Sequence, residues 1–162
     1  MQKAMTKHLA LLALTLVALS AALPPAEPWQ PFEEALATAQ VDDKKVLVFV
    51  EAPWCGWCRK LEKTVFDDAE TMKALAAHFT FARLDLDDNE QTHRFKGYRL
   101  TAMELAHHLG AETTPTTIFL HPNGEVLTTL ATYVEPVEYL KILRFIGTDA
   151  YLTQSFEEFN RP

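Results

Sequence analysis

The chain has 162 residues, of which 48% are hydrophobic and 23% are charged, the composition of an ordinary globular domain. This composition excludes a disordered, a collagen-like or a multi-span membrane protein. Its 15 basic and 22 acidic residues give a net charge of −7. That balance argues against nucleic-acid binding and against a polybasic membrane-surface module, because both need a basic face.

The first residues have the pattern of a secretory signal peptide. Lys3 and Lys7 form a basic start, Leu9–Leu19 is almost entirely apolar, and the small residues Ser20–Ala22 follow. At about 1.5 Å per residue, the apolar run is shorter than the roughly 30 Å hydrocarbon core of a bilayer. We therefore expect export and removal of residues 1–22, with an uncleaved membrane anchor as the alternative.

Helix and strand patterns alternate along the first part of the remaining chain. Pro28–Gln40 is rich in alanine and glutamate and suits a helix, and Val46–Val50 is a β-branched and aromatic run typical of a buried strand. Trp54–Lys63 has the pattern of a second helix. Asp67, followed three residues later by Glu70, indicates the capped start of an amphipathic helix.

A strand, a polar segment and a helix follow. Phe79–Leu86 alternates in hydrophobicity and predicts a strand, whereas Asp87–Tyr98 is polar and predicts an irregular surface excursion. Thr101 and Glu104 form a second capping pair in front of the predicted helix Ala102–Leu109.

The last elements predict a hairpin, a helix and a tail. Thr116–Leu120 and Glu125–Thr132 read as strands joined by the tight turn His121–Gly124, and Pro136–Gly147 has helix signals at both ends. Asp149–Phe159 reads as a short helical tail. Strands separated by helices and followed by a hairpin predict an α/β fold, a mixed sheet flanked by helices in one domain.

Two cysteines, Cys55 and Cys58, carry the candidate chemistry, because their Cys-Gly-Trp-Cys sequence follows the hydrophobic strand and opens a helix. Their spacing brings the sulfurs close enough to bridge. Cys55 would face the unpaired N–H groups and the positive end of the helix dipole, which favours the thiolate. Cys58 lies one turn further in and suits the resolution of a mixed disulfide. Gly56 would let another backbone approach closely.

A structural zinc site is the alternative use of such a pair, but it needs four ligands. The chain has no second cysteine pair, and its histidines do not fall at ligand spacing; His107 and His108 are adjacent and would point to different helix faces. We expect no metal site. The sequence contains no nucleotide, flavin or haem motif, so we expect no cofactor.

These residues resemble the thioredoxin superfamily. Residues 44–60, KKVLVFVEAPWCGWCRK, are similar to its active-site strand and helix, residues 110–120 to its loop in which a cis-proline opens a strand, and residues 121–125 to its β-hairpin. The resemblance covers roughly residues 30–147 and implies a thioredoxin fold over residues 23–162, with a tail over 148–162. Among its members the chain looks most like secreted bacterial proteins with a WCGWC active site, including the SoxW-type thioredoxins linked to periplasmic sulfur oxidation.

The resemblance also implies roles for residues around the cysteines. A cis bond before Pro115 would place the Thr114 backbone beside Cys55, where a substrate strand could pair with it. Trp54 and Trp57 would form an apolar docking surface or merely shield the sulfurs.

Two departures from the family pattern concern the active site. Trp57 stands where thioredoxin has proline, and Phe49 stands where the family has a buried aspartate. Glu51 lies two residues nearer Cys55 on the same strand face. We interpret Glu51 as a partial replacement for that proton shuttle; the alternative is a solvated carboxylate at a strand end.

The sequence therefore predicts a periplasmic thiol–disulfide oxidoreductase in which Cys55 and Cys58 reduce protein disulfides. By resemblance, a membrane thiol-reducing transporter would supply the electrons. Three alternatives stay open: a disulfide-forming oxidant of the same fold, a soft-metal carrier that binds Cu(I) through both thiolates, and a binding module in which the aromatic surface matters more than the thiols.

Overall fold

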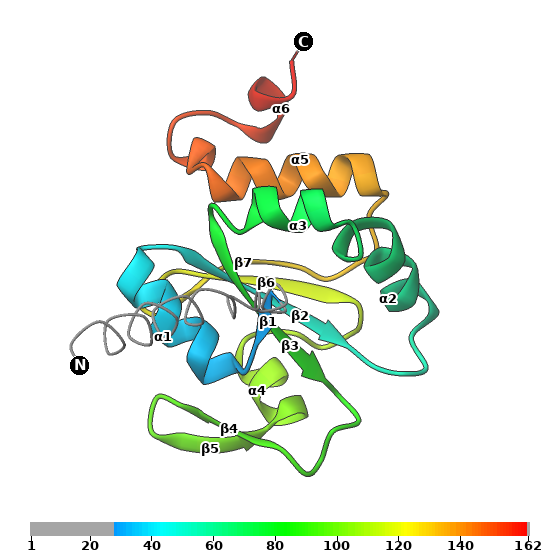
Figure 1. Cartoon of the computed structure of the whole chain (residues 1–162), viewed down its shortest axis with the longest axis vertical. Coiled ribbons are helices and arrows are strands. Elements are labelled where there is room, and N and C mark those ends of the chain that lie inside the picture. The colour runs from blue at the N-terminus through cyan, green and yellow to red at the C-terminus, as the bar shows by residue number, and fades with distance from the viewer. Residues whose placement is uncertain (1–27, 162) are drawn as a thin grey trace, which may run out of the picture.

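The computed structural model describes residues 28–161, and the predicted signal peptide lies outside them. A five-stranded mixed sheet in the order β1-β3-β2-β6-β7 forms the centre of the molecule (Figure 1). The strands of this sheet are β1 (Trp29–Gln30), β2 (Lys45–Glu51), β3 (Phe79–Asp85), β6 (Thr116–Leu120) and β7 (Val126–Leu130), and a second, two-stranded sheet consists of β4 (Thr92–Phe95) and β5 (Tyr98–Thr101).

Helices cover both faces of the sheet, with α1 and α4 on one side and α3 and α5 on the other (Figure 1). The helices are α1 (Phe32–Asp42), α2 (Gly56–Leu61), α3 (Ala69–Leu75), α4 (Ala102–His108), α5 (Pro136–Gly147) and α6 (Phe156–Phe159), together with a π-helical segment over Glu62–Phe66 and a 3₁₀ turn over Ala150–Leu152. The expected α/β fold with a mixed sheet is thereby confirmed.

Strand β2 lies in the middle of the sheet, parallel to β3 and antiparallel to β6. Val46, Val48 and Val50 pack into the core under α1 and α4, whereas Leu47 and Phe49 pack into the core on the opposite face. All five side chains are fully buried. Burial on both faces explains why this run shows no alternation of apolar and polar residues, and it fixes the start of the cysteine loop that follows.

The segment predicted to be irregular, Asp87–Tyr98, instead contains most of the β4–β5 hairpin, so that prediction was wrong. Lys96 and Gly97 make its two-residue turn with φ of 48° and 88°. His93 and Phe95 point inward and are buried, and the ring of Phe95 packs edge-on against Phe32 of α1 at 5.5 Å. The pattern was inconspicuous because exposed polar and charged residues alternate with only two buried rings.

Two predicted helix starts differ from the structure. Pro31 separates β1 from α1, where a single helix was expected over 28–40. Asp68 rather than Asp67 caps α3, because its carboxylate accepts a hydrogen bond from the Thr71 amide at 2.8 Å. Asp67 instead closes the π-helical segment by donating its amide hydrogen to the Glu62 carbonyl at 2.8 Å.

The C-terminal tail packs against α5 through aromatic contacts. Phe145 of α5 contacts the rings of Tyr151, Phe156 and Phe159 at 5.3 to 6.4 Å. Asp149 forms an ion pair at 2.7 Å with Lys45, whose side chain is mostly buried. Among residues 28–161, no helix is both long enough and apolar enough to span a bilayer.

Candidate active site

The two cysteines lie where the buried strand β2 gives way to α2, and they form a disulfide with a Cα–Cα distance of 5.3 Å. Cys55 is the N-cap residue of α2, and its sulfur accepts a hydrogen bond from the Cys58 amide at 3.1 Å. Cys58 is 1% exposed and Cys55 is 5% exposed. One free amide at the start of the helix, that of Cys58, therefore points at the Cys55 sulfur.

The Thr114–Pro115 peptide bond is cis, as the resemblance implied. The Thr114 hydroxyl lies 2.9 Å from the Val50 carbonyl oxygen and 3.1 Å from the Cys58 sulfur. The Cys55 sulfur is further away, at 3.8 Å. The loop before β6 thus reaches across the end of β2 and covers the sulfur pair.

An exposed tryptophan directly precedes each cysteine. Trp54 is 65% exposed, and its indole N–H donates to the Asp87 carboxylate at 3.2 Å. Trp57 is 56% exposed and stacks on Tyr133 with ring centroids 4.8 Å apart. Sequence reasoning identified both tryptophans but neither partner, because Asp87 and Tyr133 come from loops whose approach no local pattern reveals.

The Lys60 ammonium group lies against both rings of the Trp57–Tyr133 stack. The Lys60 ammonium group lies 5.2 Å from the Trp57 ring and 4.6 Å from the Tyr133 ring, and it forms an ion pair with Glu135 at 3.4 Å. The Tyr133 hydroxyl donates to the same carboxylate at 3.2 Å. The hydrogen bond with Tyr133 is the main reason that the pKa of Lys60 is raised. Lys60 and Glu135 therefore hold the two rings together. The stack forms a wall next to the cysteine loop.

A groove of about 350 Å³ lies between this wall and the cis-proline loop. It is lined by Trp57, Thr113, Thr114, Pro115, Ala131, Thr132 and Tyr133. The arrangement offers an extended polypeptide a surface next to the sulfurs.

Glu51 is held away from solvent by Arg83, whose guanidinium group donates to its carboxylate at 2.9 Å and also pairs with Glu62. The same guanidinium lies 4.2 Å from the ring of Trp29. Burial raises the pKa of Glu51, and the charge of Arg83 opposes that rise. Among the described residues no hydrogen bond joins Glu51 to either sulfur, so its proposed part in proton transfer would require a water or a movement of the side chain.

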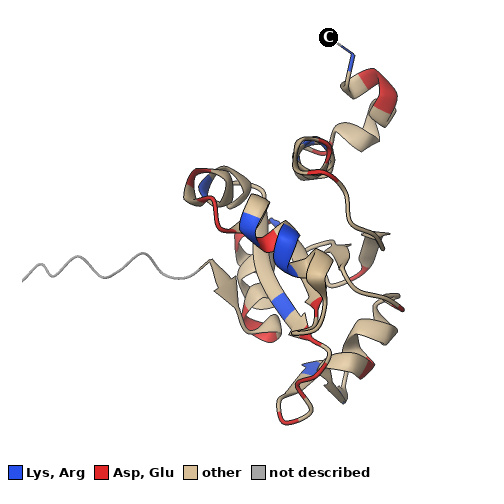
Figure 2. Cartoon of the chain, turned by 90° about the vertical axis from the view of Figure 1, so that its right-hand side faces the viewer, with Lys and Arg blue, Asp and Glu red and all other residues tan. Residues whose placement is uncertain are grey.

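The remaining candidate residues lie on α2. Gly56 has open surroundings, because a Cβ built there would meet only the Arg59 guanidinium, at 3.9 Å. Arg59 itself donates to the Pro53 carbonyl and so closes the loop before the helix. Figure 2 faces this side of the molecule and shows basic residues on the helix nearest the viewer. Residues 28–161 contain no group of three or more His, Cys, Asp or Glu side chains able to hold a metal ion.

Comparison with known proteins identifies the domain. The sequence profile of the thioredoxin-like domain family matches residues 32–147. The solution structure of a thioredoxin from Thermus thermophilus superposes with a TM-score of 0.56 at 29% identity, covering 73% of this chain and 85% of that one.

Two curated relatives are redox proteins by name. The chain is 38% identical over 61 residues to the thiol:disulfide interchange protein DsbD of Pseudoalteromonas atlantica, a stretch that covers 38% of this chain and 10% of DsbD. It is 24% identical over 100 residues to the disulfide bond reductase DsbH of Chlamydia pneumoniae, covering 61% of this chain and 59% of DsbH. The chain thus spans a small part of the first relative and rather more than half of the second.

Proposed function

Because the chain belongs to the thioredoxin-like domain family, we propose that it is a thiol–disulfide oxidoreductase and that it reduces protein disulfides outside the cytoplasm. The observation that carries this proposal is the sulfur pair itself. Cys55 caps a helix and is 5% exposed, close to Thr114 and Trp57 of the groove, whereas Cys58 is 1% exposed and its sulfur lies 3.1 Å from the Thr114 hydroxyl. Cys55 is thus positioned to react with a substrate, and Cys58 is positioned to react with Cys55.

The reaction begins from the reduced pair. The Cys55 thiolate attacks one sulfur of the substrate disulfide, so that a mixed disulfide forms and the other substrate sulfur leaves as a thiolate. The Cys58 thiolate then attacks the Cys55 sulfur. This second step forms the Cys55–Cys58 disulfide seen in the structure and releases the second substrate thiolate. Two electrons pass to the substrate, and a dithiol donor must return two electrons to the pair.

The direction and the partners are inferred from the relatives. DsbH is named a disulfide bond reductase and DsbD a thiol:disulfide interchange protein, which supports net reduction with electrons from a membrane thiol-reducing transporter. A periplasmic location follows from the proposed signal peptide over residues 1–22, with residues 23–162 as the mature domain. The closer likeness to SoxW-type thioredoxins remains part of this proposal.

Trapping the mixed disulfide tests the assigned roles. In Cys58→Ser, covalent complexes with a disulfide-bonded substrate should accumulate, because the resolving thiol is gone. In Cys55→Ser they should be scarce, because Cys58 is buried. Non-reducing electrophoresis with peptide mass mapping distinguishes the two. Equal trapping in both variants would show that the two roles are wrongly assigned.

Equilibration against glutathione buffers tests the direction. A reductant should have a potential nearer the roughly −270 mV of thioredoxin than the roughly −120 mV of DsbA. A value at the DsbA end would replace net reduction with disulfide formation. Tight binding of Cu(I) to the reduced protein, without turnover of disulfides, would instead support the soft-metal carrier.

A further inference from the structure

Strand β7 is an edge strand that lacks the features by which such strands are usually protected. It pairs with β6 on one side only, and its sequence VLTTL contains no charged residue and no proline. Val126, Thr128 and Thr129 are exposed. Natural edge strands are commonly protected from added strands by lysine, proline or extreme shortness. The opposite edge follows this rule, because β1 has only two residues, whereas β7 has five.

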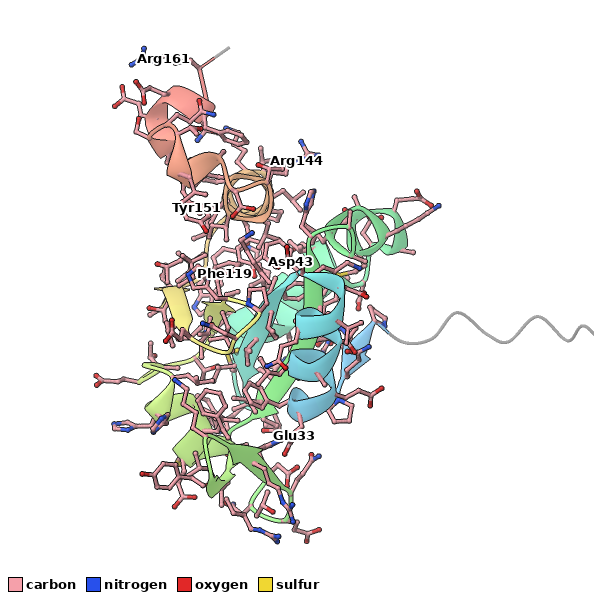
Figure 3. The ribbon with its side chains drawn as sticks, turned by 90° about the vertical axis from the view of Figure 1, so that its left-hand side faces the viewer. Glu33, Asp43, Phe119, Arg144, Tyr151 and Arg161 are labelled. Atoms are coloured by element: carbon pink, nitrogen blue, oxygen red, sulfur yellow. A yellow bond between two sulfur atoms is a disulfide. The ribbon has the colours of Figure 1, made fainter. Side chains whose placement is uncertain are left out.

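An apolar groove of about 400 Å³ lies along the same edge. Leu127 and Leu130 of β7, Ile142 and Phe145 of α5 and Tyr151 of the tail are among the side chains that line it, and within residues 28–161 its lining contains no charged group. Figure 3 labels two of the lining residues, Phe119 of β6 and Tyr151 of the tail. The groove offers apolar contacts beside the unpaired backbone groups of the strand.

Consecutive residues of one segment line this groove and the groove at the active site. Leu130 lines the apolar groove, and the next three residues, Ala131, Thr132 and Tyr133, line the groove beside the disulfide. From Thr132 back to Leu127, an extended chain covers about 17 Å, at about 3.4 Å per residue. A polypeptide bound at the sulfurs could therefore reach the apolar groove with a further five or so residues without leaving the surface of β7.

We propose that the edge of β7 and its apolar groove bind the extended polypeptide on one side of the substrate cysteine. The segment adds a strand to β7 through backbone hydrogen bonds, and its alternate apolar side chains enter the groove. This inference rests on the proposed function and names its substrate class. The preferred substrates are disulfides whose cysteine lies in an extended segment with apolar residues about five to seven positions away, as in unfolded or incompletely folded chains.

Peptide substrates of two lengths test the proposal. The short probe is the symmetric disulfide of a three-residue cysteine peptide, and the long probes add seven residues of alternating valine and threonine on either the N-terminal or the C-terminal side. We expect one long probe to be reduced with a kcat/KM about tenfold above that of the short probe, equivalent to about 1.4 kcal/mol. Replacing its valines by aspartate should remove the advantage. A long-to-short ratio near one for both long probes would overturn the proposal.

Thr128→Lys places a charge on the groove without touching the core, because Thr128 is exposed. The long-to-short ratio should fall to near one in this variant. Thr92→Lys is the matched control, since Thr92 is an exposed threonine on β4 outside the groove, and there the ratio should persist. Because the ratio compares two probes on one sample, partial unfolding of a variant lowers both rates together. An unchanged ratio in Thr128→Lys would contradict the proposal.

A binding measurement separates this inference from the proposed function. A fluorescent long peptide with serine in place of cysteine should bind the wild type saturably by anisotropy, and at least tenfold more weakly to Thr128→Lys. Such binding would support the groove even if no disulfide were reduced, in which case the proposed function fails alone. If instead the wild type is a dimer that Thr128→Lys dissociates, and the peptide does not bind, a second copy occupies the edge and the proposal is wrong.

Discussion

Thr114 brings one hydroxyl group close to the Val50 carbonyl oxygen, at 2.9 Å, and to the Cys58 sulfur, at 3.1 Å. A hydroxyl has a single proton to donate. When the Val50 oxygen accepts that proton, the Thr114 oxygen still has lone pairs directed toward Cys58. In the reduced protein these lone pairs can accept a hydrogen bond from the Cys58 thiol, whereas a disulfide sulfur has no proton to offer. Thr114 therefore stabilises the dithiol relative to the disulfide.

Replacing Thr114 by valine should shift the redox equilibrium toward the disulfide. Loss of one hydrogen bond of about 1 kcal/mol corresponds to roughly a fivefold change in the equilibrium constant with glutathione, or a potential about 20 mV more negative. Thr113→Val is the control, because the Thr113 side chain is exposed and, among the described residues, no hydrogen bond joins it to either sulfur. A shift toward the dithiol in Thr114→Val would show that the hydroxyl favours the oxidised form.

Glu51→Gln tests the proton transfer proposed for this carboxyl. A general base must be ionised, so the rate at which the mixed disulfide is resolved should rise with pH through the pKa of Glu51, which burial places above its ordinary value. The variant should lack this rise and resolve the mixed disulfide at least about tenfold more slowly. Stopped-flow tryptophan fluorescence across pH measures it. Glu62→Gln, which keeps Glu51 paired with Arg83, should keep the pH dependence; the reverse result would move the role to Glu62.

At the scale of secondary-structure elements, prediction from sequence succeeded where a pattern is long or both ends carry signals. The helix Pro136–Gly147 and the strand Thr116–Leu120 match residue for residue. The β4–β5 hairpin was missed because its stability comes from tertiary contacts of Phe95 and His93 rather than from local preference. The same difference separates the active-site residues that the sequence predicts from those that it does not. A local motif reveals Cys55 and Cys58, whereas the stack on Tyr133 depends on a loop 76 residues further along.

Gly97→Ala should destabilise the protein through the hairpin turn alone. Gly97 has a φ of +88°, and a Cβ built there would meet nothing within 4 Å. The cost is therefore the left-handed backbone itself, about 1–2 kcal/mol. Urea unfolding measures it as a lower midpoint with an unchanged slope. Gly56→Ala is the matched control for the loss of a glycine, since Gly56 has a helical φ and open surroundings; an equal loss in both variants would contradict the assignment to the turn.

At the scale of the whole molecule, an ion pair joins the C-terminal tail to the sheet. Lys45 at the start of β2 is mostly buried, and Asp149, just after α5, is its ion-pair partner. Burial alone would raise the pKa of Asp149, but hydrogen bonds from Lys45 and Tyr151 and the positive charge of Lys45 outweigh it, and the pKa is lowered. An acid whose pKa is lowered on folding stabilises the fold above its unfolded pKa. That contribution is lost as the pH falls through the folded pKa.

Asp149→Asn should lower the free energy of unfolding by about 1 kcal/mol at neutral pH. Asparagine tolerates the left-handed backbone at this position, where φ is 59°, so the change isolates the charge. The difference from the wild type should shrink below about pH 4, where the unfolded aspartate takes up its proton. Denaturant unfolding at several pH values measures it. Glu157→Gln removes an exposed pair 4.0 Å from Arg161 and should change nothing; a pH-independent loss in Asp149→Asn would refute the ionic explanation.

The central position of β2 also determines which parts of the molecule can open locally. Both edges of β2 are hydrogen-bonded, to β3 and to β6. Its amide protons should therefore exchange with solvent only through global unfolding. The amide protons of the β4–β5 hairpin and of α6 should exchange through local openings that cost little free energy. The cysteine loop begins where β2 ends. The spacing of the two sulfurs is therefore insulated from fluctuations at the periphery, and the disulfide stays in place while the hairpin and the tail open.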